Sequence, residues 1–499
     1  MLFNSPIYIF IFLPIVVFVY FLLNRWRLVT AGKAWLVSAS LYFYAYWNTD
    51  YLLIIIGSML VNYAIGSSFN KSRANQSGII RKKHRHLSKK AILVTGIIFN
   101  LSLLGYFKYA DFFIGNLNQL AGSSFEFLNL LLPLAISFFT FQQIAYLIDS
   151  YQDESHEYDF LNYCLFVTFF PQLIAGPIVH HKEMMPQFSR LRNYFYNFDN
   201  IAKGLIIFSI GLFKKVGIAD SFALWADAGF DTETQLSFFE AWGASLSYTF
   251  QLYYDFSGYS DMAIGAALMF NIRLPVNFNS PYKAINIQDF WRRWHITLSR
   301  WLRDYLYIPL GGNRKGPSRA IVNSTTTMLL GGLWHGAGWT FVLWGGLHAM
   351  AMAIHRAWGL LNINLPRFVA WFITFMFINF SWVFFRAESV DGAMNIIRGM
   401  LGYNGIALTD SVALRLEGMG VQGASLLYSK DYEFVVGEKA AGLIIVFGLV
   451  AFLAKNSLQI LDAIKEYKIR HIILVAWALF FALTSAITNQ PSQFLYFNF

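Results

Sequence analysis

DFWRRWHITLSRWLR, at residues 289–303, and GGLWHGAG, at residues 331–338, are the most distinctive stretches of this chain. Both place charged or aromatic side chains inside a sequence that is otherwise largely apolar. An ionised group at the centre of a bilayer costs at least about 2.5–3.5 kcal/mol. These two stretches are therefore the expected chemical centre, and the apolar segments around them are expected to form the fold.

The composition is that of a membrane protein. Of 499 residues, 56% are hydrophobic and 13% are charged, whereas soluble domains carry about 25% charged residues. The mean hydropathy is +0.45. An ordinary cytosolic enzyme is excluded, and the net charge of +10 is explained by cytoplasmic loops rather than by nucleic-acid binding. The single cysteine, Cys164, excludes an internal disulfide and a cysteine metal cluster.

Apolar segments recur along the chain, and they predict an all-α, polytopic integral membrane protein with a single membrane domain over residues 1–499. The predicted membrane segments are 6–24, 34–47, 51–69, 91–107, 127–148, 160–178, 201–218, 238–270, 348–361, 368–385, 440–453 and 472–487. Basic residues after the first segment and in the loop Lys71–Lys90 predict cytoplasmic loops, which leaves both termini outside. Segment 391–439 is predicted to be a polar outer segment.

Two of these segments contain prolines or carboxylates, which are unusual in a simple membrane-spanning helix. PQLIAGP at residues 171–177 predicts a broken or re-entrant helix, which is tolerated where protein or a water-filled cavity surrounds it. Asp255 and Asp261 lie in the aromatic sequence YDFSGYSD at residues 254–261. An ion site is one interpretation of these carboxylates. Hydrogen bonding to helix ends or to buried arginines is the preferred one.

The arginine-rich stretch predicts a helix capped by Asn286 that lies along an interface or lines a cavity. One face carries Trp291, Trp294, Leu298, Trp301 and Tyr305. Its arginines, Arg292, Arg293, Arg300 and Arg303, project largely elsewhere. They either bind phosphates of an acyl donor, which suits bidentate guanidinium geometry, or extend to lipid headgroups.

His335 is the first catalytic candidate, because a neutral imidazole can take a proton from an attacking hydroxyl at physiological pH. The glycines around it allow close backbone approach and access for a ligand. His295 is the second candidate. His348 is open to either a functional or a structural role, and His355 is interpreted as structural. Metal binding is unsupported, because no His-Glu-x-x-His spacing occurs.

Several long motifs resemble those of the bacterial membrane-bound O-acyltransferases, in the branch of the alginate and peptidoglycan O-acetyltransferases. They are PLAISFFTFQ (133–142), FPQLIAGP (170–177), GLFKK (211–215), DFSGYSD (255–261), FSWVFFRA (380–387) and the two central stretches. The resemblance implies a helical fold with a central funnel, re-entrant or interfacial helices and a catalytic core over residues 127–390. The family's invariant histidine falls on His335, and its second polar position falls on His295.

The resemblance also implies an activity: O-acetylation of an extracytoplasmic polysaccharide, alginate or a related exopolysaccharide, at the bacterial inner membrane. Acetyl-CoA is the expected donor, with no bound cofactor, and a periplasmic esterase-like transferase is the expected partner. Because GPIVHHKE at 176–183 is less like the alginate enzymes, peptidoglycan or another envelope glycan is the alternative acceptor. A transporter or channel and an assembly scaffold are alternatives from other classes. The candidate donor-binding or tunnel-lining residues are Arg292, Arg293, Arg300, Arg303, Asp255, Asp261, Trp334 and His348.

The carboxy-terminal sequence QPSQFLYFNF, at residues 490–499, resembles the tyrosine motif of a small partner protein in teichoic-acid D-alanylation. In that motif a tyrosine hydroxyl carries the acyl group, so the resemblance makes Tyr496 a candidate acyl carrier. The alternative is an interfacial aromatic anchor formed by Phe494, Tyr496, Phe497 and Phe499.

Overall fold

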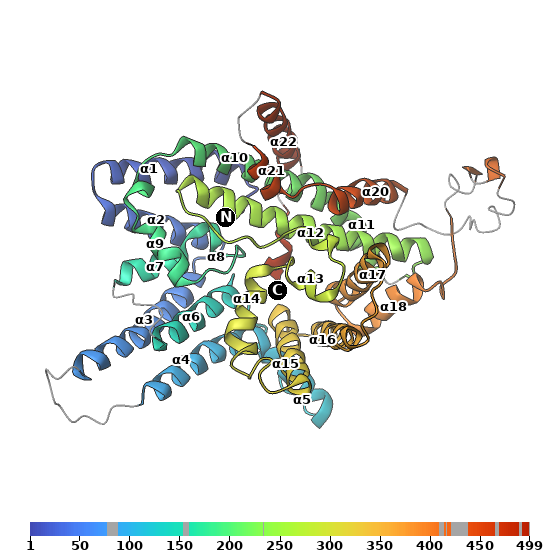
Figure 1. Cartoon of the computed structure of the whole chain (residues 1–499), viewed down its shortest axis with the longest axis horizontal. Coiled ribbons are helices and arrows are strands. Elements are labelled where there is room, and N and C mark those ends of the chain that lie inside the picture. The colour runs from blue at the N-terminus through green and yellow to red at the C-terminus, as the bar shows by residue number, and fades with distance from the viewer. Residues whose placement is uncertain are drawn as a thin grey trace. The chain divides into compact units, whose positions relative to one another are not determined.

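The computed structural model is built from helices, and no strand occurs in the residues it describes (Figure 1). Those residues are 1–76, 88–152, 159–232, 234–408, 414–415, 417–420, 438–464, 469–488 and 492–498. They form two compact units that interleave along the chain. The first comprises 1–210, 259–276 and 486–499, and the second comprises 211–258 and 277–485. The prediction of an all-α protein is confirmed.

The first unit begins with a helical hairpin and is centred on a buried helix, α6. Its helices are η1 (Tyr8–Phe12), α1 (Leu13–Arg25), α2 (Val29–Ala45), α3 (Tyr51–Gln76), α4 (Lys89–Leu104), η2 (Gly105–Tyr109), α5 (Ala110–Ala121), α6 (Ile136–Tyr151), α7 (Phe160–Thr168), α8 (Phe170–Leu173), α9 (His181–Phe188), η3 (Leu191–Tyr194) and α10 (Phe198–Leu212). Helix α1 packs on α2, and α6 packs on both α3 and α4. Almost every side chain of α6 is buried, including the polar Gln142, Gln143 and Asp149.

The predicted break near Pro171 is present. Helix α7 ends at Thr168, Phe169 leaves the helical conformation, and the short α8 restarts at Phe170. Pro171 lies in the first turn of α8, where its missing N–H costs nothing. The surrounding side chains are fully buried, as expected for irregular backbone inside a membrane protein.

The second unit carries the two distinctive stretches. Its helices are η4 (Phe213–Ala219), α11 (Asp220–Phe230), the first part of α12 (Phe238–Met269), η5 (Pro281–Lys283), α13 (Ile287–Trp291), α14 (Ile296–Leu302), η6 (Arg303–Tyr307), α15 (Pro317–His335), α16 (Trp339–Leu360), α17 (Arg367–Arg386), α18 (Val390–Met400), α20 (Glu438–Leu453), α21 (Ser457–Ala463) and α22 (Ile469–Thr488). Helices α15 and α16 form a tightly packed hairpin, and α17 packs on α16.

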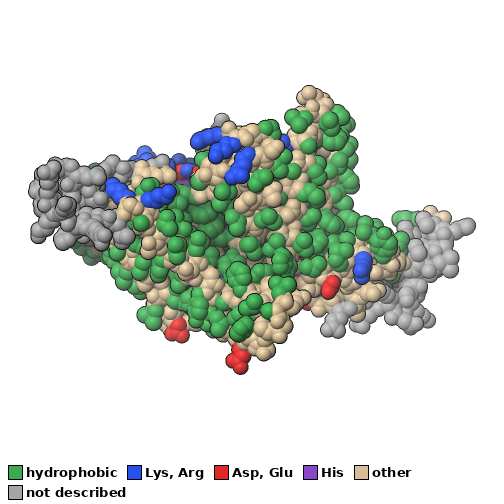
Figure 2. Space-filling view, turned by 90° about the horizontal axis from the view of Figure 1, so that it is seen from below, with side chains coloured by type: hydrophobic (Ala, Val, Ile, Leu, Met, Phe, Trp, Pro, Cys, Tyr) green, Lys and Arg blue, Asp and Glu red, His purple; other side chains and the backbone are tan. Residues whose placement is uncertain are grey.

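Four described helices are long and apolar enough to cross a membrane: Tyr8–Arg25, Tyr51–Phe69, Lys89–Ala121 and Arg367–Arg386. A further bent pair, Lys439–Leu453 with Ser457–Ala463, makes a fifth if it is one span. Figure 2 shows hydrophobic side chains over most of the visible face. A bilayer is the solvent that such a surface fits, and the chain is a multi-pass membrane protein.

The predicted segment 127–148 starts too early. The chain leaves the helical conformation after Ala121, and α6 begins only at Ile136. The carboxylate of Asp111 accepts hydrogen bonds from the backbone N–H groups of Leu128 and Asn129, which fixes this loop in a non-helical path. Of the predicted outer segment 391–439, α18 is helical, and 409–413, 416 and 421–437 lie outside the described residues. Most side chains of Lys71–Lys90 also lie outside them.

Candidate active site

His335 is the last residue of α15, and its ring is buried. Three aromatic rings surround it, with centroid distances of 4.9 Å to Trp334, 5.1 Å to Trp344 and 5.0 Å to Phe385. Phe385 comes from α17 and Trp344 from α16. Three helices therefore hold the imidazole in an apolar cage in which a proton acceptor would be shielded from bulk water.

Glycines let α15 and α16 approach closely beside His335. A Cβ added at Gly345 would lie 2.6 Å from the backbone oxygen of Met328, and one at Gly332 would overlap the backbone oxygen of Phe341. At Gly336 a side chain would overlap the ring of Phe341. The predicted close backbone approach is confirmed, and the space left by Gly336 is taken by Phe341.

His295 lies at a break in what the sequence predicts to be one continuous helix. Helix α13 ends at Trp291, and α14 starts at Ile296. Between them His295 takes a left-handed conformation with φ of 41°, which is uncommon for residues other than glycine. The prediction of a continuous helix is wrong here, although the Asn286 cap is confirmed by its hydrogen bond from the N–H of Asp289.

Asn277 explains the position of this break. Its backbone oxygen accepts the N–H of Ile296 at 3.0 Å. Its side-chain Oδ1 accepts the hydroxyl of Thr297 at 3.0 Å and that residue's N–H at 3.4 Å. The same oxygen lies 3.0 Å from Nδ1 of His295. The backbone N–H of Thr297 can only donate, so the Asn277 side-chain atom that it meets is the amide oxygen. An amide oxygen only accepts, so Nδ1 of His295 must carry the proton. The neutral ring then has its lone pair on Nε2.

Trp334 contacts both candidate histidines. Its ring centroid is 6.2 Å from that of His295 and 4.9 Å from that of His335. The fully buried His295 also meets the edge of Phe256, a residue of α12, at 4.8 Å. Two histidines 40 positions apart in sequence are thus brought into contact with one indole.

His348 belongs to the same aromatic cluster. Its ring lies 4.6 Å from Trp344 and 5.2 Å from Trp291. Its Nε2 is 3.1 Å from the hydroxyl of Ser381, which itself donates to the backbone oxygen of Ile378. The serine oxygen therefore accepts, and His348 is the tautomer protonated at Nε2. This tautomer leaves Nδ1 as a buried acceptor that makes no hydrogen bond within the described part of the chain.

Three of the four arginines pair with carboxylates. Nε of Arg293 is 2.8 Å from Asp289, Nε of Arg303 is 2.7 Å from Asp304, and Arg300 is 3.7 Å from the same aspartate. Arg292 and Arg303 are exposed, whereas the tryptophans of the stretch are buried. The predicted separation of aromatic and basic faces is confirmed, and a donor-binding role for these arginines stays a prediction.

Asp255 and Asp261 lie in different compact units of the structure. Asp255, 1% exposed, forms an ion pair of 2.7 Å with Lys215, which also contacts Asp220 at 2.8 Å. The sequence suggests an arginine or a helix end as the partner, and the structure gives the lysine of GLFKK. Asp261 is buried in the first unit. The ion pair fixes the part of α12 that carries Phe256, the residue that contacts His295.

The carboxy-terminal turn η8 (Leu495–Asn498) belongs to the first unit. Phe494 is buried and stacks on Tyr259 at 4.3 Å, and Phe497 meets Trp47 at 5.9 Å. These contacts pack the tail onto the first unit, and an interfacial position of its aromatic rings stays a prediction. The side chains of Tyr496 and Phe499 lie outside the described residues.

Sequence reasoning missed Asn277 and Ser381 as partners of histidines, because each is far from its histidine along the chain. Phe385 could have been identified from the sequence, because it lies in the motif FSWVFFRA. No group of three or more His, Cys, Asp or Glu side chains in the described part of the chain is arranged to hold a metal ion.

Comparison with known proteins agrees with the resemblance seen in the motifs. The model of the family described as MBOAT, membrane-bound O-acyltransferase family, matches residues 41–390. A peptidoglycan O-acetyltransferase of Helicobacter pylori is 46% identical over 100% of this chain and 98% of its own length. A probable alginate O-acetylase of Pseudomonas aeruginosa is 41% identical over 86% of this chain and 80% of its own. A teichoic acid D-alanyltransferase of Streptococcus thermophilus is 27% identical over 45% of this chain and 57% of its own.

Proposed function

We propose that this chain, which belongs to the membrane-bound O-acyltransferase family, uses His335 to transfer an acetyl group from a cytoplasmic thioester for O-acetylation of an extracytoplasmic glycan. The chain is an O-acyltransferase. The observation that carries the assignment to His335 is its burial among Trp334, Trp344 and Phe385, at the point where α15, α16 and α17 meet.

In the proposed reaction His335 is the general base. Its neutral ring takes the proton of an attacking hydroxyl, and the oxygen forms a bond to the acyl carbon. The carbon–sulfur bond breaks, and the leaving thiolate takes up that proton from the imidazolium to leave as a thiol. Such proton transfer contributes roughly 10²–10⁴ in rate. His295, with Nδ1 held by Asn277, has Nε2 as a second acceptor and contacts the same Trp334 ring. Acetyl-CoA is the proposed donor.

Peptidoglycan is the proposed acceptor. The similarity to the Helicobacter pylori peptidoglycan O-acetyltransferase extends over both whole chains at 46% identity. Alginate or a related exopolysaccharide is the second candidate. Probable alginate O-acetylases support it at 41% identity, but over 86% of this chain.

The proposal places the chain in the bacterial inner membrane with both termini outside, and with a periplasmic esterase-like transferase as its partner. Tyr496 is the proposed carrier of the acetyl group on the outer side. The packing of Phe494 on Tyr259 and of Phe497 on Trp47 is compatible with this role, because neither contact involves Tyr496.

The test compares ester-linked acetate, released by mild base from peptidoglycan and from secreted polysaccharide, in cells with the wild-type chain or His335→Ala at matched membrane abundance. Arg319→Ala, an exposed change on α15, is the control. Loss of acetate in His335→Ala alone supports the proposal, and the polymer that loses acetate identifies the acceptor. Unchanged acetate in His335→Ala overturns the mechanism and favours transport or scaffolding.

A further inference from the structure

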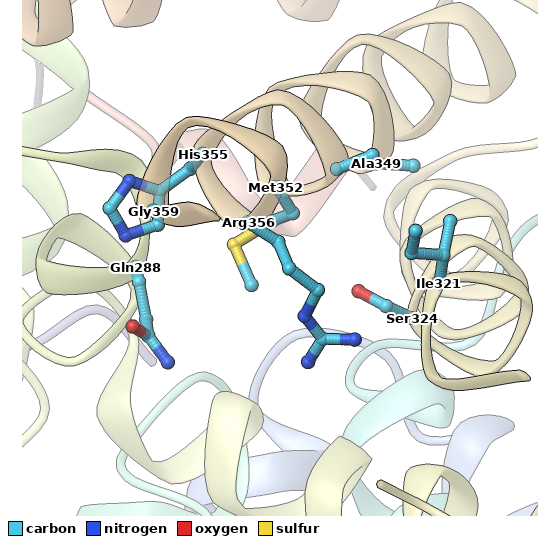
Figure 3. A pocket seen from close by; sticks show the side chains of 9 residues that line it. Gln288, Ile321, Ser324, Ala349, Met352, His355, Arg356 and Gly359 are labelled. Carbon is cyan, nitrogen blue, oxygen red and sulfur yellow. The ribbon is translucent and has the colours of Figure 1, made fainter. Parts of the chain in front are cut away.

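A cavity of about 250 Å³ lies between α13, α15 and α16. Its polar lining comes from Gln288 on α13, Ser324 on α15, and His355 and Arg356 on α16, with Ile321 and Met352 as apolar walls. Figure 3 shows the side chain of Arg356 extending into the space between Gln288 and Ser324. His355, which the sequence suggests is structural, lies on the same rim.

The cavity is positively charged, because Arg356 carries a charge and none of the lining residues is acidic. Nη2 of Arg356 donates to Oδ1 of Asn313 at 3.1 Å, which uses one of the five guanidinium N–H donors. No described carboxylate forms an ion pair with Arg356. A half-buried guanidinium without a counterion, next to a hydroxyl, an amide and an imidazole, is a set of groups suited to a phosphate.

The same helices connect this cavity to the histidine cluster. On α16, Trp344 contacts His335, and Arg356 lies twelve residues further along. At 1.5 Å per residue the separation along the helix is about 18 Å. On α13, Gln288 lines the cavity and Trp291 contacts His348. A ligand held by its phosphate at Arg356 would therefore need a long, extended arm to place an acyl group at His335.

We infer that this cavity binds a phosphate group of the water-soluble acyl donor, a phosphorylated thioester with an extended linker between its phosphate and its acyl group. The inference rests on the proposed function for the identity of the donor. Arg356 forms the charged contact, Asn313 holds its guanidinium, and Ser324 and Gln288 supply neutral hydrogen bonds. The headgroup of an anionic phospholipid is a second source of the same phosphate chemistry, and the experiment separates the two.

The experiment measures binding of coenzyme A to the full-length chain, purified in a lipid-free detergent, by calorimetry. Arg356→Gln is compared with Arg356→Lys, which keeps the charge, and with Arg319→Gln, a matched loss of one arginine outside the cavity. Arg356→Gln is expected to weaken binding roughly ten- to a hundredfold, the range for one hydrogen bond to a charged group. Arg356→Lys should keep part of the affinity, and Arg319→Gln should bind as the wild type does. Ser324→Ala, a smaller change, should give a weaker effect in the same direction.

Binding of coenzyme A by His335→Ala separates this inference from the proposed function. Wild-type affinity in that variant, together with weakened binding in Arg356→Gln, supports the phosphate site even if acetate transfer fails its own test. Equal affinity of wild type and Arg356→Gln for coenzyme A overturns the donor site. If Arg356→Gln binds coenzyme A as the wild type does but no longer retains phosphatidylglycerol in nanodiscs, the cavity binds the phosphate of a lipid headgroup. If Arg356→Gln retains both ligands as the wild type does, the cavity is not a phosphate site.

Discussion

Oδ1 of Asn277 lies 3.0 Å from Nδ1 of His295 and accepts from Thr297 at the same time. One amide oxygen thus fixes both the left-handed turn at His295 and the tautomer of its ring. An orienting group of this kind determines which ring nitrogen is available to a substrate. Asn277 is therefore a positioning residue for His295.

We predict that Asn277→Asp, which keeps the shape of the side chain, impairs transfer and changes its pH dependence. A carboxylate at this position would stabilise the protonated imidazole of His295, so the neutral ring would be populated only at higher pH. The acidic limb of the pH–rate profile should move to higher pH, measured as initial rates of acetyl transfer by purified membranes. Thr297→Val is the control, because it removes a neighbouring hydrogen bond to the same oxygen and leaves the histidine contact in place. An unshifted profile in Asn277→Asp would show that His295 does not take part in proton transfer.

The α15–α16 contact gives a second prediction. Gly345→Ala would place a methyl group 2.6 Å from the backbone oxygen of Met328, and backbone cannot move aside as a flexible side chain can. Overpacking of this kind typically costs about 1–3 kcal/mol. The adjacent Gly346→Ala is the matched control, since its nearest neighbour would be the Leu329 side chain at 3.9 Å. Thermal unfolding in detergent should show a lower midpoint for Gly345→Ala, and an unchanged or slightly higher one for Gly346→Ala because alanine favours a helix. Equal midpoints would refute the close contact.

The glycines beside His335 and the tryptophans of residues 289–303 show what could be predicted from the sequence. The glycine spacing beside His335 predicts close packing from local sequence alone, and the structure agrees. The helical pattern of Trp291, Trp294 and Trp301 correctly separates buried from exposed side chains. The residue pattern predicts the buried face because aromatic rings bury a large apolar area and so determine which face of a segment packs inward.

The break at His295 could not be predicted in this way. Periodicity favours one helix through residues 289–303. The hydrogen bonds that interrupt it come from Asn277, eighteen positions earlier than His295. Likewise, Ser381 reaches His348 only because α17 packs on α16. Long-range contacts that override local helix preference leave no signal in a single sequence.

The buried ion pair between Lys215 and Asp255 gives a third prediction. Lys215→Met leaves the carboxylate of Asp255, 1% exposed, without its lysine. Removing one partner of a buried pair typically costs about 3–5 kcal/mol, so the variant should unfold at a markedly lower temperature. The double change Lys215→Met with Asp255→Leu should recover most of that loss, because the carboxylate that remains, that of Asp220, is 25% exposed and stays partly hydrated. Lys203→Met, which breaks a more exposed pair with Asp199, should have little effect. A single variant as stable as the wild type would show that the pair contributes nothing.

The last prediction concerns Tyr496. Tyr496→Phe keeps an aromatic ring for an anchor but removes the hydroxyl that an acyl carrier requires. If the tyrosine carries acetyl, this change should abolish ester-linked acetate on the polymer while the chain remains folded and abundant in the membrane. The carboxy-terminal peptide of the wild type should also contain a fraction with one added acetyl group, measured by mass spectrometry, that is absent from the variant.

Two controls separate the carrier from the anchor. Tyr403→Phe is a matched loss of a hydroxyl at a tyrosine that is 79% exposed, and it should leave acetate unchanged. Phe494→Ala removes the ring that stacks on Tyr259 and should lower stability, because truncating a buried phenylalanine costs about 3–5 kcal/mol. Normal acetate in Tyr496→Phe would assign the tail to anchoring alone, and the acyl group would then have to pass directly from the transferase to a hydroxyl of its partner or of the glycan.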